Sequence, residues 1–292
     1  MSDLASAPNA PWLERKGSRE MILQAFVFVG LGLLAVLFLL PLLWMVSTSL
    51  KPIEETMKMP PTFIPTSPKW ENFREAVQRI PFLRYFGNTV WVSVLGTVGV
   101  VISSSLVAYG FAFLRWPGRD LFFWLTVATM MIPFPVIMVP LYGVFRKFGM
   151  IGTLMPLWLP AWFGSAWDIF LMRQFFLGIP KDLLDAARID GATEFQIWRK
   201  IVLPVAAPVM VVVGLFHVIY SWNDFLGPLL YLTKQEKYTL SLGLQFYQSQ
   251  SGGTEWHLLM AASVLMVLPV LVLFLLGQRA LIRGITMTGI KM

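Results

Sequence analysis

The chain has no cysteine and only two histidines among its 292 residues. The lack of cysteine excludes disulfide bonds and thiolate sites. His217 and His257 are too few and too scattered to form a metal cluster. Charged residues are scarce as well, since they make up 13% of the chain, whereas a soluble domain averages about 25%. These shortages argue against a metalloenzyme and against a soluble fold.

Sequence patterns typical of enzymes are also missing. There is no Walker-type nucleotide loop, no set of residues with metal-ligand spacing, and no serine–histidine arrangement with supporting context. We therefore expect no catalytic residue, no metal and no cofactor bound by this chain. The net charge of +7 does not predict nucleic-acid binding, because the basic residues lie beside apolar runs and not in a stripe. Basic loops that face the cytoplasm and anionic lipid account for it.

Long apolar runs are what the chain does contain. Hydrophobic residues make up 57% of it, and each run is long enough to cross about 30 Å of hydrocarbon at 1.5 Å per residue. The first run exceeds a signal-peptide core of about 7–15 residues, so we expect it to be retained. We predict an all-α membrane protein with six transmembrane helices, at about residues 21–45, 86–114, 121–145, 154–176, 205–231 and 258–281.

The basic residues indicate the orientation of these helices. Lysine and arginine are frequent at both chain ends and in the connections after the second and fourth runs, so the positive-inside rule favours an N-in, C-in arrangement. We expect a cytoplasmic tail over 1–20, a transmembrane domain over 21–283 with a cytoplasmic loop at 177–204, and a cytoplasmic tail over 284–292. The proline-rich outer connection 47–85 cannot form one long helix, but residues 70–80 fit a short amphipathic helix.

Prolines and buried charges mark irregular positions in the runs. Pro133 and Pro135 fall inside the third run, where proline frees backbone carbonyls and can kink a helix. Asp168 should face protein or water, because a charge costs about 2.5–3.5 kcal/mol at the bilayer centre. An ion pair with Arg173 and a role in transport are both open for Asp168.

The fifth run carries the candidates for a solute pathway. Asn223 and Asp224 offer an amide and a carboxylate for hydrogen bonding, and the aromatic residues Tyr220 and Trp222 lie beside them. Sugar sites commonly combine such groups, although the same residues can serve packing alone. His217 in this run is expected to be a packing residue.

The loop at 177–204 has the pattern of a helix, a glycine turn and a second helix. Pro180 suits the first turn of a helix, and Gly191 is a natural helix stop. Thr193 and Gln196 have the spacing of a capping box, which would start the second helix. Such a segment could anchor the bundle at the membrane surface, or it could dock a partner.

Charges and small residues in the first of these helices favour the docking of a partner. Asp185 is spaced to contact Lys181 four residues before it and Arg188 three residues after it. Ala186 and Ala187 present almost no side chain, so another surface can approach closely.

This loop resembles the "EAA" signature of ABC importer inner-membrane subunits, in which Glu-Ala-Ala is followed at fixed spacing by Gly and then by Ile-x-Leu-Pro. The matching residues are Asp185, Ala186, Ala187, Gly191, Ile201, Leu203 and Pro204. The one departure is Asp for Glu at 185, which keeps the carboxylate on a shorter stem. The segments 186–193 and 221–225 are similar to the carbohydrate branch of these permeases, and specifically to the smaller, six-helix partner of the maltose-type heterodimer.

The resemblance implies a type I ABC importer permease in the bacterial cytoplasmic (inner) membrane. With a second homologous permease, the chain would form the pathway for a sugar or oligosaccharide that an extracytoplasmic binding protein delivers. Two ATP-binding cassette subunits would bind ATP and magnesium, hydrolyse the ATP and move the loop helix. The residues that would couple the permease to these subunits are Asp185, Ala186, Ala187, Arg188, Asp190, Gly191, Ile201, Leu203 and Pro204.

An ion-coupled secondary transporter of a small polar solute is the alternative. Such a protein should show two corresponding halves with broken helices, and none is evident in this sequence. Two further regions take on roles from the resemblance. The outer segment 233–256 is either a contact for the binding protein or a solvated loop, and the tail 284–292 would reach toward the ATPase subunits.

Overall fold

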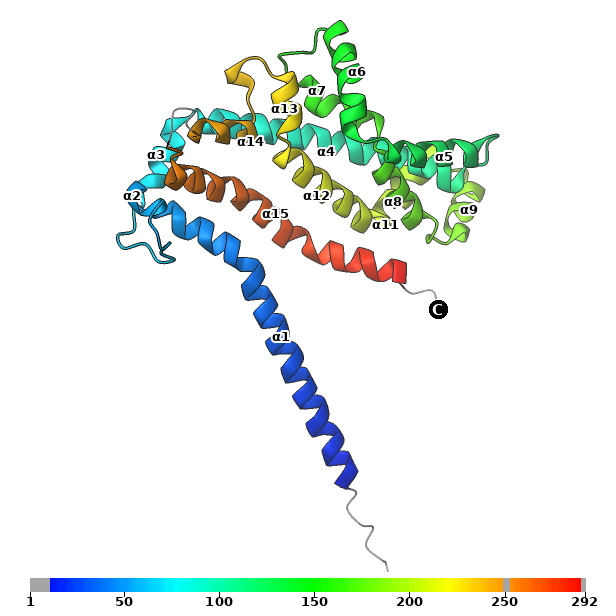
Figure 1. Cartoon of the computed structure of the whole chain (residues 1–292). Coiled ribbons are helices and arrows are strands. Elements are labelled where there is room, and N and C mark those ends of the chain that lie inside the picture. The colour runs from blue at the N-terminus through cyan, green and yellow to red at the C-terminus, as the bar shows by residue number, and fades with distance from the viewer. Residues whose placement is uncertain (1–10, 249–252, 290–292) are drawn as a thin grey trace, which may run out of the picture.

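The computed structural model describes residues 11–248 and 253–289, and every regular element in these ranges is a helix (Figure 1). The predicted all-α class is confirmed. Three helices are continuous and apolar enough to cross a membrane: α1 (Pro11–Ser49), α4 (Phe82–Phe113) and α15 (Trp256–Gly289). Two bent pairs of helices raise the candidates to at most five among the described residues, so six spans stay a prediction.

The two end helices extend into the predicted tails. α1 begins at Pro11, so residues 11–20 of the expected N-terminal tail are helical. α15 continues to Gly289 and includes most of the expected C-terminal tail. Residues 1–10 and 290–292 of the predicted tails, and 249–252 of the outer segment, lie outside the described residues.

The third apolar run forms two helices and not the single helix expected over 121–145. α5 (Arg119–Ala128) continues in the 3-10 turn η1 (Thr129–Met131) and meets α6 (Phe134–Lys147) at a bend of 102°. Ile132, at the bend, has an extended backbone with ψ of 112°. The next residue, Pro133, explains this conformation, because a proline ring disfavours the α region for the residue before it.

The fourth and fifth runs are also divided into shorter helices. α7 (Met155–Trp158) and the 3-10 helix η2 (Leu159–Phe163) precede α8 (Ala166–Phe176), and α12 (Ala207–Asn223) precedes α13 (Leu226–Tyr231). Gly164 separates η2 from α8 with a φ of +85°, which glycine adopts without steric cost. Asp224 separates α12 from α13 with an extended backbone.

α4 is the central helix of the bundle. It packs against α8, η2 and α12, while α15 packs against α12 and α1. Small residues on α4 let its neighbours approach closely. A Cβ atom at Gly99 would lie 2.4 Å from Cδ1 of Trp162, and one at Gly96 would lie 2.7 Å from Nε2 of His217.

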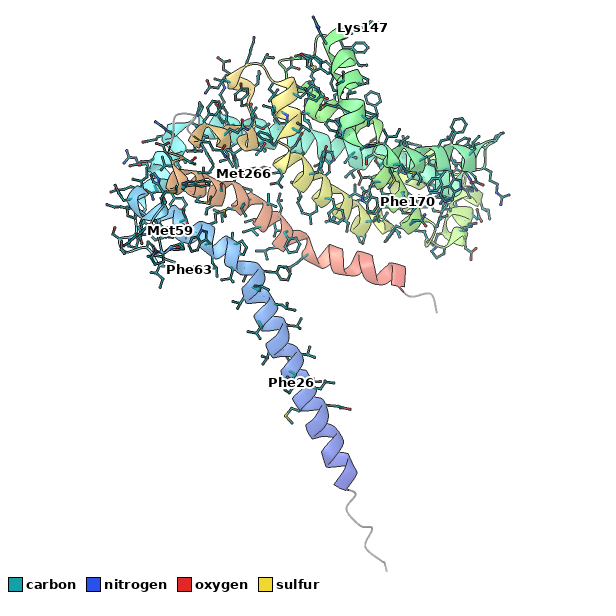
Figure 2. All side chains as sticks on the ribbon, in the orientation of Figure 1. Phe26, Met59, Phe63, Lys147, Phe170 and Met266 are labelled. Carbon is teal, nitrogen blue, oxygen red and sulfur yellow. The ribbon has the colours of Figure 1, made fainter. Side chains whose placement is uncertain are left out.

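α1 leaves this bundle along most of its length (Figures 1 and 2). Its apolar span, Leu23–Ser49, has an 18-residue window in which no residue is buried. Phe26 and Phe38 are 73% and 79% exposed. In a membrane, lipid or another protein must cover this surface, because apolar side chains avoid water.

Short elements gather at the end of α4 that lies opposite α9 (Figure 1). They include α2 (Ile53–Thr56), α3 (Glu71–Arg79) and α14 (Leu240–Gly243), and η4 (Gln235–Lys237) and η5 (Leu244–Tyr247) flank α14 in the sequence. α3 is the short helix expected near residues 70–80. Part of the outer segment packs and is not an open loop, since Leu240 and Tyr247 are 0% and 1% exposed.

Glu55 organises the proline-rich connection between α1 and α4. Its Oε1 accepts a hydrogen bond from the Thr62 hydroxyl at 2.7 Å, and its Oε2 accepts one from the Thr66 hydroxyl at 3.0 Å. The Thr62 bond is the main cause that lowers the pKa of Glu55, with further contributions from Thr66 and from Lys51. The carboxylate thereby fixes a segment that has little regular structure of its own.

Candidate functional site

The predicted cytoplasmic loop folds as a helix, a glycine turn and a second helix. The first helix, α9 (Lys181–Ile189), begins after Pro180. At its end, the Gly191 amide donates to the carbonyl of Arg188 and the Ala192 amide donates to the carbonyl of Ala187, both at 3.0 Å. Gly191 has a φ of +80°. This is a Schellman cap, which favours glycine at the left-handed position.

A capping box starts the second helix, as its sequence predicts. At the start of α10 (Glu194–Ile197), the backbone amide of Gln196 donates to the Thr193 hydroxyl at 3.3 Å. In return, the backbone amide of Thr193 donates to the side-chain Oε1 of Gln196 at 2.9 Å. The chain then continues through the π-helical turn η3 (Trp198–Val202) and α11 (Leu203–Val205). The run Glu194–Val205 meets α12 at 79°, so the segment turns sharply before the chain enters the bundle.

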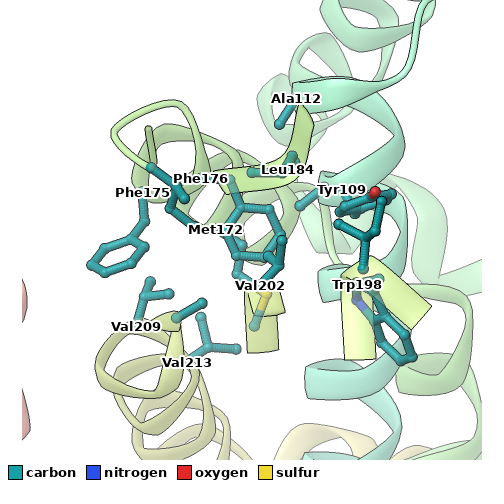
Figure 3. Packing of buried hydrophobic residues seen from close by; sticks show 14 of the residues in the cluster. Tyr109, Ala112, Met172, Phe175, Phe176, Leu184, Trp198, Val202, Val209 and Val213 are labelled. Atoms are coloured by element: carbon teal, nitrogen blue, oxygen red, sulfur yellow. The ribbon is translucent and has the colours of Figure 1, made fainter. Parts of the chain in front are cut away.

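One face of this segment belongs to a hydrophobic core shared with α4 and α8 (Figure 3). The cluster includes Leu184, Ala187, Trp198 and Val202 of the loop segment, Tyr109 of α4, and Met172 and Phe176 of α8. Leu184 is 1% exposed and Ala187 is 8% exposed, while Ile201 and Leu203 pack against the same cluster. Ala187 therefore packs inside the chain and is not part of an open approach surface.

The rest of the α9 surface is open, and it carries apolar side chains beside exposed charged residues such as Asp182. Leu183 and Ile189 are 48% and 87% exposed, and Ala186 lies between them in the sequence and is also exposed. Spacing of three residues places these side chains on one side of a helix. We name Leu183, Ala186 and Ile189 the docking face. Exposed apolar side chains in a polar loop are typical of a surface that contacts another protein.

Arg188 joins α9 to α10 through a polar network. Its Nη1 donates to Oδ1 of Asp185 at 2.6 Å, and its Nε and Nη2 donate to the two carboxylate oxygens of Glu194 at 2.8 Å and 3.3 Å. Glu194 also accepts a hydrogen bond from the Tyr109 hydroxyl of α4. Hydrogen bonds with Glu194 first, and then with Asp185, raise the pKa of Arg188 above its usual value, so the guanidinium stays charged.

The expected contact between Asp185 and Arg188 is therefore confirmed. The expected contact between Lys181 and Asp185 is not among the ion pairs of the described residues. Arg188 explains the difference, because it already holds the Asp185 carboxylate at short range. Two other predicted residues, Asp190 and Pro204, are exposed; Asp190 is the C-cap residue of α9, and Pro204 lies in the first turn of α11.

A second candidate site is a cavity of about 830 Å³ within the bundle. Its lining comes from α4, α6, α7, η2, α8, α12 and α13. Tyr220 and Asp224 of the predicted pathway line it. Trp222 does not, because it is 4% exposed and donates its indole N–H to the carbonyl of Met266 at 3.0 Å. Asn223 is also outside the lining and donates its amide to the carbonyl of Ile219 at 2.8 Å.

The cavity adds polar residues that the sequence does not group together. Asp168, His217 and Tyr231 all line it. The ion pair considered for Asp168 is absent among the described residues, because the Arg173 guanidinium lies 4.0 Å from the ring centre of Phe123. The hydrophobic periodicity of the apolar runs does not predict that these three residues lie together. Their positions depend on how the runs break and fold against one another.

Comparison with known proteins identifies the family of the chain. Residues 99–287 match the family described as binding-protein-dependent transport system inner membrane component. The chain is 35% identical to the permease protein AraQ of the arabinooligosaccharides transport system of Halalkalibacterium halodurans, over 94% of this chain and 99% of that one. It is 34% identical to the permease protein UgpE of the sn-glycerol-3-phosphate transport system of Pectobacterium atrosepticum, over 91% and 96%.

The fold is shared with a solved transporter. The structure of a bacterial ABC transporter involved in the import of the acidic polysaccharide alginate contains a chain that matches with a TM-score of 0.78 and 23% sequence identity. The match covers 89% of this chain and 97% of that chain. The predicted permease fold is thereby confirmed.

Proposed function

The chain belongs to the family of binding-protein-dependent transport system inner membrane components, and on that premise we propose that it imports a saccharide together with a second, homologous permease. It is a permease subunit of an ABC importer in the inner membrane. The ion-coupled alternative does not fit a family whose transport depends on a binding protein. The saccharide cargo is supported by a relative named for arabinooligosaccharides.

The two faces of α9 are the observation that carries the coupling part of the proposal. Leu184 and Ala187 fix α9 to the core of α4 and α8, while Ile189, 87% exposed, points away from it. A cytoplasmic ATPase subunit bound to the docking face would therefore move the transmembrane helices whenever it moved α9. ATP and magnesium would be bound by two such subunits and not by this chain.

The predicted coupling residues divide into two roles in this proposal. Asp185, Ala186, Arg188, Asp190 and Gly191 shape the exposed side of α9 and its turn. Ala187, Ile201 and Leu203 pack the segment against the bundle, and Pro204 lies where the chain turns toward α12. The second set would transmit movement that the first set receives.

Other surfaces are assigned to the remaining partners. The extracytoplasmic binding protein would meet the end of the bundle that carries α3 and α14, because this end lies opposite α9 (Figure 1). The second permease and membrane lipid would cover the exposed apolar length of α1.

Charging the docking face tests the proposal. The double variant Leu183→Asp, Ile189→Asp replaces two exposed apolar side chains, each of which would contribute about 1.5–3 kcal/mol if fully buried by a partner. We expect at least a tenfold loss of ATPase subunits that co-purify with the permease, and a matching loss of ATP-dependent uptake. The second permease should still co-purify, because the altered residues lie outside the bundle core.

The matched control is Ile64→Asp, which charges a residue that is 79% exposed in the connection between α1 and α4. This variant should retain the ATPase subunits. The coupling proposal is wrong if the double variant and this control retain equal amounts of ATPase.

A further inference from the structure

The cavity between α4, α6, α8, α12 and α13 is lined by a buried polar side chain that the fold leaves without a partner. Tyr231 is 3% exposed, lines the cavity, and its hydroxyl has no hydrogen-bond partner among the described residues. His217 also lines the cavity, but its Nε2 atom faces Gly96 of α4, where an added Cβ atom would lie 2.7 Å from it. A buried hydroxyl group without a hydrogen-bond partner is destabilising, so Tyr231 favours a hydrogen-bonding ligand in the cavity.

Two carboxyl groups share this lining. Asp168 is 6% exposed and makes no ion pair within the described ranges. Asp224 uses one oxygen, Oδ1, to accept the Gly227 amide at 3.0 Å. A Cβ atom at Gly227 would lie 2.3 Å from the other oxygen, Oδ2, so the glycine leaves the space that this carboxylate occupies. Carboxylate oxygens accept hydrogen bonds from hydroxyl groups.

The lining has no matching positive charge. The described residues that line the cavity include neither lysine nor arginine. A phosphate or a uronate that entered would lose hydration without gaining a cationic partner, and an unpaired charge in a low-dielectric site is costly. A neutral hydroxylated ligand avoids this cost and can pair with the Tyr231 hydroxyl.

The apolar part of the lining suits the same ligand. Trp167 and Phe216 line the cavity beside the polar groups, and both are partly exposed. A sugar ring has C–H faces that pack on aromatic rings and hydroxyl groups around its edge. The volume of about 830 Å³ lies within the range of about 300–1,000 Å³ that is usual for small-molecule sites.

We propose that this cavity is a subsite for an uncharged saccharide, with Asp168, Asp224 and Tyr231 as ligands of its hydroxyl groups. The inference rests on the proposed function, because the cavity becomes a subsite only as part of a transport pathway. It separates the cargo of this chain from those named for two similar proteins, sn-glycerol-3-phosphate and the acidic polysaccharide alginate. Both of those cargoes are anionic.

The test uses the complete transporter, with both permeases, the ATPase subunits and the binding protein, in proteoliposomes. Three radiolabelled probes are compared: a mixture of neutral di- and trisaccharides, sn-glycerol-3-phosphate, and an alginate trisaccharide. Uptake of the imported probe is then measured as a function of its concentration in the variants Asp168→Asn and Tyr231→Phe. These substitutions remove one charge or one hydroxyl and keep the side-chain shape. Asp120→Asn is the control, since Asp120 is exposed and paired with Arg119 outside the cavity.

We expect only the neutral saccharides to be imported. The half-saturating concentration should rise about tenfold in Asp168→Asn and Tyr231→Phe, as for the loss of one buried hydrogen bond, and stay at the wild-type value in Asp120→Asn. ATP-driven import of sn-glycerol-3-phosphate or of the alginate trisaccharide would overturn the subsite proposal while leaving the importer function intact. So would half-saturating concentrations at the wild-type value in both cavity variants. No ATP-dependent import of any probe would overturn both.

Discussion

Arg188, near the end of α9, and Glu194, at the start of α10, face each other across the Gly191 turn through two hydrogen bonds of 2.8 Å and 3.3 Å. A planar guanidinium that binds a carboxylate at two points fixes orientation as well as distance. Because Glu194 also accepts a hydrogen bond from Tyr109, the pair links α9 to α4. Movement of α9 is therefore tied to the central helix by a directional contact in addition to apolar packing.

The variant Arg188→Lys tests whether this geometry matters for transport. Lysine keeps the positive charge but cannot reproduce the two-point contact. We expect more ATP to be hydrolysed for each solute imported, and a loss of stability of about 1 kcal/mol, because the pair is partly exposed. The ratio of ATPase rate to uptake rate, measured in proteoliposomes, checks the first effect.

The control for this variant is Arg84→Lys. Arg84 meets Glu236 through a single exposed contact of 3.5 Å, so lysine should replace it without effect on the ratio. If Arg188→Lys also leaves the ratio unchanged, the Arg188–Glu194 pair supports structure only and does not transmit movement.

The loop segment was predictable from sequence because its structure follows from neighbouring residues. Gly191 ends a helix and Thr193 with Gln196 starts the next one, and each of these rules acts within five residues. The Asp185–Arg188 contact is local in the same way. The link from Glu194 to Tyr109 crosses 85 positions of sequence, and no local pattern indicates it.

The cavity illustrates what sequence could not supply. Trp222 and Asp224 are close neighbours in the chain, and both have groups that suit a sugar. Trp222 is buried against α15 and Asp224 lines the cavity, because the helix breaks at Asp224. The bends at Ile132, Gly164 and Asp224 bring Asp168 and Tyr231 to the same cavity, and hydrophobic periodicity says nothing about the direction in which a broken helix continues.

The connection between α1 and α4 should show a defined response to acid. Hydrogen bonds, chiefly from Thr62, lower the pKa of Glu55 below the ordinary value of 4.5. A carboxyl group with a lowered pKa stabilises the folded state above its unfolded-state pKa, and this contribution is lost as the pH falls through the lower folded-state value. The unfolding midpoint should therefore be insensitive to Glu55 between about pH 8 and pH 5 and should fall below about pH 4.5.

The variant Glu55→Gln removes this carboxylate, so its midpoint should lie below that of the wild type at pH 7 and the two should converge toward pH 3. Thermal unfolding of the purified complex at several pH values measures this. The control is Glu54→Gln, since Glu54 is the exposed neighbour. Parallel midpoint curves for the wild type and Glu55→Gln across the whole pH range would contradict the role given to this carboxylate.

Substitution of Gly191 can distinguish the effect of backbone strain on stability from an effect on coupling to the ATPase subunits. Gly191 and Gly149 have similar backbone conformations, with φ of +80° and +68°, and an added Cβ atom at either position meets no atom within 4 Å. Alanine should therefore cost about 1–2 kcal/mol at both sites through backbone strain alone. Gly149 lies in the connection after α6, away from α9.

We expect Gly191→Ala and Gly149→Ala to lower the unfolding midpoint of the purified complex by similar amounts. Only Gly191→Ala should reduce solute-stimulated ATPase activity and uptake, because strain at its Schellman cap changes the angle between α9 and α10 and so moves the docking face relative to α4. Measuring the midpoint and the transport rate in the same preparation compares the two effects directly. Equal losses of transport in both variants would mean that general instability, and not the position of α9, limits the activity of the complex.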